Sequence, residues 1–216
     1  MKKKGIIVQN NNDITIKDGM GAWQRWAKRA SDIVCSLSGL VILSPLILGI
    51  ALLMKMQRNG PVFFSQERIG YGGVPFTIYK FRTMTTMIED SVPQLVAKCD
   101  HTNSTPLEVF LRSHHLDELP QLWNVLRGDM SLVGPRPERR YFIEKIMECD
   151  ARYRFIYMMK PGLTSEATLY NGYTDTMEKM LKRLSMDLHY LETRSLWLDT
   201  KILFKTAANL ITGKKF

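Results

Sequence analysis

The feature that most constrains this chain is residues 33–54, a run of 22 residues without a charged side chain. As an α-helix this run would be about 33 Å long at ~1.5 Å per residue, which is enough to cross the hydrocarbon core of a bilayer. A helix buried in a soluble core is the alternative, but such helices are seldom so uniformly apolar over this length. We therefore expect a membrane segment.

Ser44 and Pro45 lie in the middle of this segment. Pro45 has no backbone N–H, and its ring clashes with the preceding turn, so the helix should kink there, while Ser44 can hydrogen-bond a carbonyl that the proline frees. Cations flank both ends of the segment: Arg25, Lys28 and Arg29 before it, and Lys55 and Arg58 after it. A straight span with a kink and a hairpin that enters and leaves on one face both fit these signals.

The composition of the whole chain narrows the remaining choices. Its 216 residues include 30 Lys and Arg against 21 Asp and Glu, which gives a formal net charge of +9. A hydrophobic fraction of 45% excludes a fully disordered chain, and only 3 cysteines, far apart, exclude a disulfide scaffold. The excess positive charge indicates an anionic partner, such as nucleic acid, acidic lipid or a phosphorylated substrate.

Residues 62–84 have the pattern of a β-hairpin that turns through residues 70–73. Strand alternation places Lys80 and Arg82 on one face, about 7 Å apart along the strand. This spacing suits neighbouring phosphate oxygens, and a solvated strand edge is the alternative.

The densest group of chemically active residues lies between residues 112 and 140. Apolar residues from Leu119 to Leu126 follow the spacing of an amphipathic helix that Gly128 should end, so Asp117 and Glu118 fall at its N-terminal end. Capping of the helix is the alternative role for Asp117.

Two arginines accompany this carboxylate pair. Arg112 precedes it by five residues, and Arg136 stands between two prolines that restrict the backbone. A rigidly presented guanidinium can bind phosphate in a bidentate manner. Carboxylates beside such cations are typical of phosphoryl transfer with a hard metal ion, usually Mg²⁺.

Five segments in this order resemble one known family: the Ser44-Pro45 segment, VFFSQERIG (62–70), YKFRTM (79–84), LDELPQLWNVLRGDMSLVGPRP (116–137) and KPGLT (160–164). The chain resembles, over about residues 24–216, the bacterial sugar transferases of the small, monotopic polyprenyl-phosphate phosphoglycosyl transferase type. These enzymes move a phosphosugar from a UDP-sugar to polyprenyl phosphate, here expected to be undecaprenyl phosphate.

The resemblance implies a role for each matching residue. Asp117 matches the nucleophile that attacks the sugar-bearing phosphate and releases UMP, and Glu118 completes an acidic dyad that binds Mg²⁺ together with the diphosphate. Three cations match the positive residues around the phosphates: Lys80, Arg112 and Arg136. Asp187 matches a further acidic position near the site. Arg82 is expected to join the phosphate-binding cations on the strand. The apolar segment is implied to be re-entrant, with its break at Ser44-Pro45.

The expected fold is mixed α/β (α+β), mainly helical with a small β-hairpin, and it is attached to the membrane by a re-entrant helix–break–helix. The expected parts are a polar arm (1–22), the membrane segment (23–58) and a cytoplasmic catalytic domain (59–216) that ends in amphipathic helices. The expected location is the cytoplasmic face of the bacterial inner membrane, in contact with membrane lipids and without nucleic acid, and a homo-oligomer stays open.

Two features leave alternatives open. Residues 163–173 depart from the common family pattern, with Tyr173 where an arginine is expected, so the sugar is not assigned. A basic module that binds a membrane or nucleic acid without catalysis is the alternative function. Such a module should carry its cations in stripes with interleaved aromatics, whereas here they gather around two carboxylates.

Overall fold

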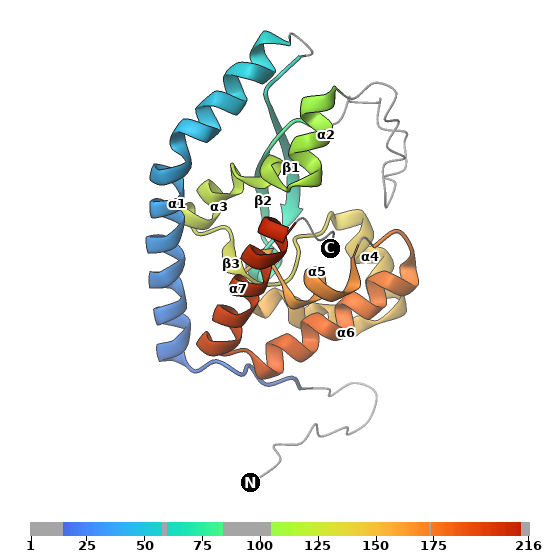
Figure 1. Ribbon diagram of the computed structural model, residues 1–216. Coiled ribbons are helices and arrows are strands. Elements are labelled where there is room, and N and C mark those ends of the chain that lie inside the picture. The colour runs from blue at the N-terminus through green and yellow to red at the C-terminus, as the bar shows by residue number, and fades with distance from the viewer. Residues whose placement is uncertain (1–14, 58–59, 84–104, 173, 213–216) are drawn as a thin grey trace.

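The computed structural model describes residues 15–57, 60–83, 105–172 and 174–212 (Figure 1). It is mostly helical with one small antiparallel β-hairpin, as the sequence predicts. The helices are α1 (Ala22–Met56), α2 (Pro106–Ser113), α3 (Gln121–Arg127), α4 (Arg140–Cys149), α5 (Glu166–Asn171), α6 (Met177–Thr193) and α7 (Leu196–Thr212), and the strands are β1 (Phe63–Ile69), β2 (Pro75–Phe81), β3 (Ser131–Val133) and β4 (Gly162–Thr164). Most of the predicted polar arm and the position of Tyr173 lie outside the described residues.

Strands β1 and β2 form the predicted hairpin, with Phe63 opposite Phe81 and Ile69 opposite Pro75. The turn contains Gly72 and Gly73 with φ values of 67° and 75°, a region of backbone space that glycine enters without steric cost.

Strands β3 and β4 pair in parallel, which the sequence analysis did not predict. Their backbones approach closely where Gly134 faces Gly162. A Cβ atom on Gly162 would lie 2.1 Å from the amide nitrogen of Gly134, so this crossing requires glycine. The pairing fixes the start of the segment that carries Arg136.

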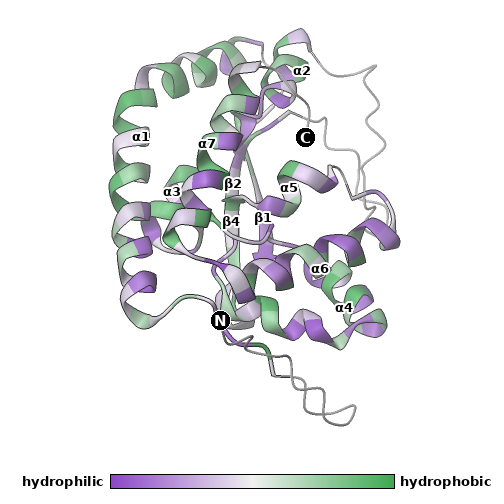
Figure 2. Ribbon diagram, turned by 60° about the horizontal axis from the view of Figure 1, so that its bottom comes forward, coloured by the Kyte–Doolittle hydropathy of each residue, from purple (hydrophilic) through white to green (hydrophobic). Residues whose placement is uncertain are grey.

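Helix α1 differs from the predicted helix–break–helix in one respect. The backbone stays helical through Pro45, and the helix bends near its middle instead of breaking (Figures 1 and 2). The carbonyl that Pro45 leaves without its N–H donor is that of Val41, four residues earlier, and the Ser44 hydroxyl donates to this oxygen at 2.8 Å. Because the freed carbonyl is satisfied, the helix continues as a bent helix. The re-entrant path stays a prediction.

The two sides of α1 have reversed polarity. Within the described chain, α1 is the one helix long and apolar enough to cross a membrane, and only 11% of that apolar stretch is buried. The α1 residues that are buried include Asp32 and Ser36, whereas large apolar side chains such as Ile42 (74% exposed) and Leu48 (64% exposed) face outward. This reversal fits an apolar surrounding for the outer side of α1.

The main core lies on the other side of the molecule. It is formed by apolar residues of α4, of the 3-10 segment Ala151–Met158 that follows it, and of α6. Leu184, Leu188 and Leu191 of α6 pack in this core. Residues 15–21 lie against the end of α6, where the Arg194 guanidinium binds the Asp18 carboxylate at 2.6 Å.

Candidate active site

The acidic dyad occupies a short 3-10 turn, Leu116–Glu118, between α2 and α3. His115 starts this turn with a φ of 55°, in the left-handed region that non-glycine residues rarely adopt. Helix α3 follows, and it ends at Gly128, whose φ of 102° suits a C-terminal glycine. The predicted helix after the dyad and its glycine stop are therefore confirmed.

Asn124 of α3 aligns the hairpin with the dyad. Its side-chain oxygen accepts the N–H of Tyr79 at 3.2 Å, and its side-chain nitrogen donates to the carbonyl of Thr77 at 2.7 Å. Asn124 is fully buried and thus completes the backbone hydrogen bonds of β2 at this point. Lys80 directly follows Tyr79 on this strand, so these hydrogen bonds place Lys80 close to Glu118.

Glu118 lies between two cations. Its Oε1 atom is 2.5 Å from the Lys80 ammonium and 3.3 Å from the Arg136 guanidinium, and only 14% of its side chain is exposed. Arg136 is held at the start of its loop, because the Gly134 N–H donates to the Thr164 carbonyl at 3.0 Å. Lys80, Glu118 and Arg136 come from three separate parts of the sequence, and the fold brings them together.

The pKa values of the two adjacent carboxyl groups are shifted in opposite directions. Burial and the negative charge of Glu118 raise the pKa of Asp117 to about 6, against the opposing effect of Lys80 and Arg136. Burial alone would raise the pKa of Glu118 as well, but Lys80 and Arg136 outweigh it and hold that pKa well below its usual range. At neutral pH both groups are ionised, and Asp117 is the more basic and hence the better nucleophile.

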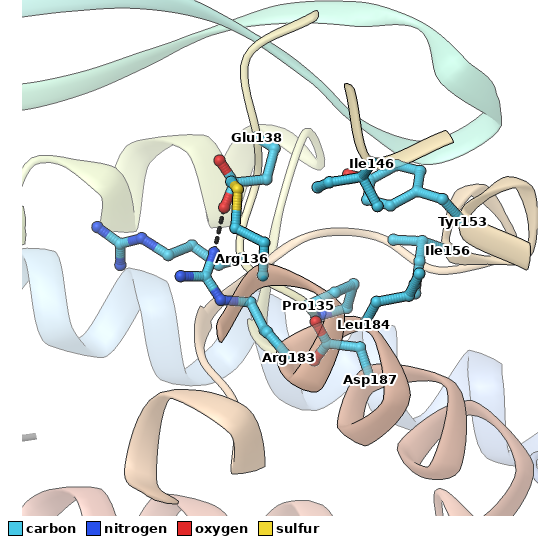
Figure 3. A pocket seen from close by; sticks show the side chains of 10 residues that line it. Pro135, Arg136, Glu138, Ile146, Tyr153, Ile156, Arg183, Leu184 and Asp187 are labelled. Atoms are coloured by element: carbon cyan, nitrogen blue, oxygen red, sulfur yellow. Dashed lines mark hydrogen bonds and ion pairs between the residues drawn. The ribbon is translucent and has the colours of Figure 1, made fainter. Parts of the chain in front are cut away.

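A pocket lies beside Arg136, the residue that pairs with Glu118 (Figure 3). Its lining includes Arg136, Glu138, Tyr153, Arg183 and Asp187. Arg183 forms an ion pair with Glu138. Asp187 is 5% exposed and makes no hydrogen bond or ion pair with any described residue, so burial raises its pKa to about 7.

The other two predicted cations lie at α2. Arg82 is buried against α2, where its guanidinium is 3.9 Å from the Glu108 carboxylate. Arg82 is the first residue after the end of β2. Arg112 lies in the last turn of α2, and its carbonyl accepts the N–H of His115 at 3.3 Å.

The donor set of the dyad fits part of a magnesium site. Asp117 offers a carboxylate without an ion-pair partner among the described residues, while one Glu118 oxygen is already held by two cations. No group of three or more potential metal ligands occurs in the described parts of the chain. Mg²⁺ commonly binds through one or two carboxylates and completes its shell with substrate phosphates and water, and the two carboxylates present here are compatible with such a site.

Several residues of the site were missed by the sequence analysis. Glu138 follows Arg136 by two residues, and Arg183 precedes Asp187 by four, which places that pair on one face of α6. This i, i+4 spacing was a usable signal. Arg68 of β1 is a further missed residue: it is half-buried, its guanidinium lies 3.8 Å from the Glu138 carboxylate, and desolvation lowers its pKa to about 10.

Fold and site together define a protein with a long, outward-facing apolar helix and an acidic dyad in which Asp117 is buried and Glu118 is held by two cations. A family model for bacterial sugar transferases matches residues 23–213. The chain is 38% identical over 186 residues to the UDP-N-acetylgalactosamine-undecaprenyl-phosphate N-acetylgalactosaminephosphotransferase of Aeromonas hydrophila, a match that covers 86% of this chain and 44% of that protein.

Two further relatives differ in length. The chain is 44% identical to the UDP-glucose:undecaprenyl-phosphate glucose-1-phosphate transferase of Klebsiella pneumoniae, over 83% of this chain and 39% of that one. It is 39% identical to the exopolysaccharide production protein PSS of Rhizobium leguminosarum, over 88% of this chain and 98% of that one. The chain thus spans less than half the length of the first two relatives. It belongs to the bacterial sugar transferase family.

Proposed function

We propose that this protein transfers a sugar phosphate from a UDP-sugar to undecaprenyl phosphate and releases UMP, as a first membrane step in the assembly of a bacterial glycan. The observation that carries the proposal is the pair of carboxylates with opposite titration: Glu118 is neutralised by Lys80 and Arg136, and Asp117 beside it keeps a basic carboxylate. The names of the relatives above supply the substrate class.

The first step forms a bond between an Asp117 carboxylate oxygen and the sugar-bearing phosphorus of the donor. The phosphorus–oxygen bond to UMP breaks, and UMP leaves with that electron pair. Arg136 and Lys80 lie where they can stabilise negative charge on the transferring phosphoryl group. Because Glu118 already offsets part of their charge, donor binding would draw these cations from Glu118 towards the phosphates.

In the second step a phosphate oxygen of undecaprenyl phosphate attacks the same phosphorus. The bond to Asp117 breaks, the lipid diphosphate sugar forms, and the carboxylate is restored. A carboxylate nucleophile thus divides one transfer into two easier ones. Bound Mg²⁺ would neutralise charge on the diphosphate of the donor, and Asp117 and the second oxygen of Glu118 are the residues that would hold it.

The membrane attachment of the chain supports a lipid acceptor. Helix α1 presents its apolar side outward, and Trp23 and Trp26, which are 69% and 70% exposed, stand at its N-terminal end. Tryptophans are typical of the boundary between membrane and water. We place α1 in the cytoplasmic leaflet of the inner membrane with the site on the cytoplasmic face, where the donor is dissolved.

The test is release of UMP from a panel of UDP-sugars by the full chain in detergent with undecaprenyl phosphate. The panel also identifies the sugar that the departure at residues 163–173 leaves unassigned. A basic binding module releases no UMP from any member of the panel, and that result would overturn the proposal.

We expect EDTA to abolish UMP release and added Mg²⁺ to restore it, because the diphosphate carries charge that Lys80 and Arg136 cannot fully offset while Glu118 holds them. The measurement is the rate of UMP release before chelation, after chelation and after addition of Mg²⁺. Full activity in excess EDTA would show that the dyad works without a divalent metal.

A further inference from the structure

A set of buried polar contacts joins α1 to strand β3. The Lys28 ammonium donates to the Val133 carbonyl at 2.9 Å, and the Asp32 carboxylate accepts the N–H of Leu132 at 3.0 Å. Asp32 is 3% exposed and the Lys28 side chain 11% exposed. These two residues, one turn apart on the inward side of α1, therefore bind consecutive residues of one strand.

Asp199 of α7 connects this contact to the rest of the domain. Its Oδ2 atom lies 2.5 Å from the Lys28 ammonium, and its Oδ1 atom accepts the hydroxyl of Tyr190 at 2.5 Å. Tyr190 is a buried residue of α6. Helices α1, α6 and α7 thus meet at one buried carboxylate.

Strand β3 leads directly into the candidate active site. Only Gly134 and Pro135 separate Val133 from Arg136, and both are buried and bound to β4: the Gly134 N–H donates to the Thr164 carbonyl, and the Gly162 N–H donates to the Pro135 carbonyl. Arg136 then reaches Glu118. A short, pinned stretch of backbone therefore runs from Lys28 to the guanidinium.

Charged side chains are a costly way to attach a helix. Burying an ammonium and a carboxylate costs free energy unless each is paired and hydrogen-bonded, and apolar residues of similar volume often hold two elements together as well. What hydrogen bonds add is direction. Because the outer side of α1 is apolar and makes no directional contact, these inward contacts define where α1 lies along β3.

We propose that Lys28, Asp32 and Asp199 are positioning residues that set Arg136 relative to the membrane helix. They hold β3 against α1, and the segment after β3 places Arg136 at the dyad. The position of α1 and the geometry of the phosphate-binding site therefore depend on each other. This inference rests on the proposed function, in which Arg136 acts on the donor phosphates.

The test is a double-mutant cycle in the full chain. The variant Lys28→Met with Asp199→Asn removes the pair without leaving an unpaired buried charge, and the asparagine oxygen can still accept from Tyr190. We expect kcat/KM for UMP release to fall about tenfold or more with Arg136 in place, the value of a lost hydrogen bond to a charged group. In an Arg136→Ala background, assayed at high protein concentration, the same change should cost less than about twofold.

The matched control is Arg194→Met with Asp18→Asn, since this ion pair is similarly buried but does not touch β3. Its effect should be the same in both backgrounds. Equal losses from the Lys28 variant in both backgrounds, or no loss at all, would overturn the inference.

Amide hydrogen exchange separates this inference from the proposed function, because it needs no activity. Peptides covering residues 131–136 should exchange faster in the Lys28 variant than in the control variant. Unchanged exchange there would overturn the positioning role, whereas a wild-type protein that releases no UMP would overturn the proposed function instead.

Discussion

Helices α1 and α6 are both long, but they differ in which side chains they bury and which they expose. Helix α6 buries Met180, Leu184, Leu188 and Leu191 and exposes charged residues, whereas α1 buries Asp32 and Ser36 as well as Ile50 and Met54, and exposes leucines, valines and tryptophans. Figure 2 shows α1 largely hydrophobic along its length and α6 mixed. In both helices the side that faces the protein carries the residues for which the protein supplies packing or hydrogen-bond partners.

The difference shows what fixes each helix. Apolar side chains on α6 gain stability by leaving water, and their packing is not directional. On α1 the outer apolar side has lipid as its expected surrounding. The inner side is attached by apolar packing of Ile50 and Met54 and by hydrogen bonds such as those of Arg29, which donates to the Val125 and Leu126 carbonyls at the end of α3. Mutations on the two helices should therefore have different consequences.

The largest expected difference comes from truncating one leucine on each helix. Leu191→Ala removes a fully buried side chain of α6 and should lower the free energy of unfolding by about 2–5 kcal/mol. Leu48→Ala on the exposed side of α1 should change it by less than about 0.5 kcal/mol. Denaturant or thermal unfolding in detergent measures both. Similar losses at the two positions would show that α1 packs on protein along both sides.

Asp187 is the exception on α6, because it is a buried carboxyl that has no hydrogen bond to any residue that the structure describes. Its pKa is raised from 3.8 to about 7 by burial, so between these pH values the folded state binds the proton more tightly and stability falls as pH rises. Asp187→Asn should therefore stabilise the fold at pH 7.5 by about 1–3 kcal/mol and have little effect near pH 4.

The same variant should lose activity if Asp187 serves the site, since a group kept at a cost in stability is typical of a functional position. Unfolding at the two pH values and UMP release at pH 7.5 are the measurements. Glu178→Gln, an exposed position in the first turn of α6, is the control. A loss of stability at neutral pH would indicate that Asp187 has a structural partner.

The bend in α1 gives a third prediction, in which the effect is on topology. Replacing Ser44 by Leu and Pro45 by Ala restores the backbone N–H at position 45 and removes the side-chain bond to Val41, so a straight, membrane-spanning helix is favoured. Single cysteines at Gly21 and Gln57 are labelled with a membrane-impermeant reagent in intact and lysed cells, with the native cysteines removed.

In the native segment both cysteines should react only after lysis. In the Ser44→Leu, Pro45→Ala variant, reaction of one cysteine in intact cells is expected. A native Gly21→Cys protein that reacts in intact cells would show that α1 crosses the membrane and that the re-entrant placement is wrong.

The parts of the fold that could be predicted are those governed by local patterns. The hairpin follows from strand alternation and its glycines, α3 from apolar spacing and Gly128, and the inward bond of Ser44 from the chemistry of Pro45. The dyad and Arg136 drew attention because carboxylates and cations gather between residues 112 and 140, whereas Lys80 was assigned to the phosphates through the resemblance to the sugar transferase family.

The parts that could not be predicted depend on contacts between distant segments. Strands β3 and β4 have three residues each and leave no periodic signal. Arg82 was expected beside Lys80 from strand alternation, but the strand ends at Phe81 and Glu108 of α2 supplies the opposite charge. Lys28 looked like a membrane-flanking cation, because nothing in its neighbours shows that Asp199 and Val133 are its partners.

The most direct test of the central claim is the mass of the intact protein after mixing with the active UDP-sugar in the absence of undecaprenyl phosphate. The wild-type chain should release a nearly stoichiometric burst of UMP and gain the mass of the sugar phosphate, with the modified peptide containing Asp117. Asp117→Asn should show neither change, while the control Asp175→Asn at an exposed position should behave as wild type. Turnover with undecaprenyl phosphate by a folded Asp117→Asn protein at the wild-type rate would contradict the account.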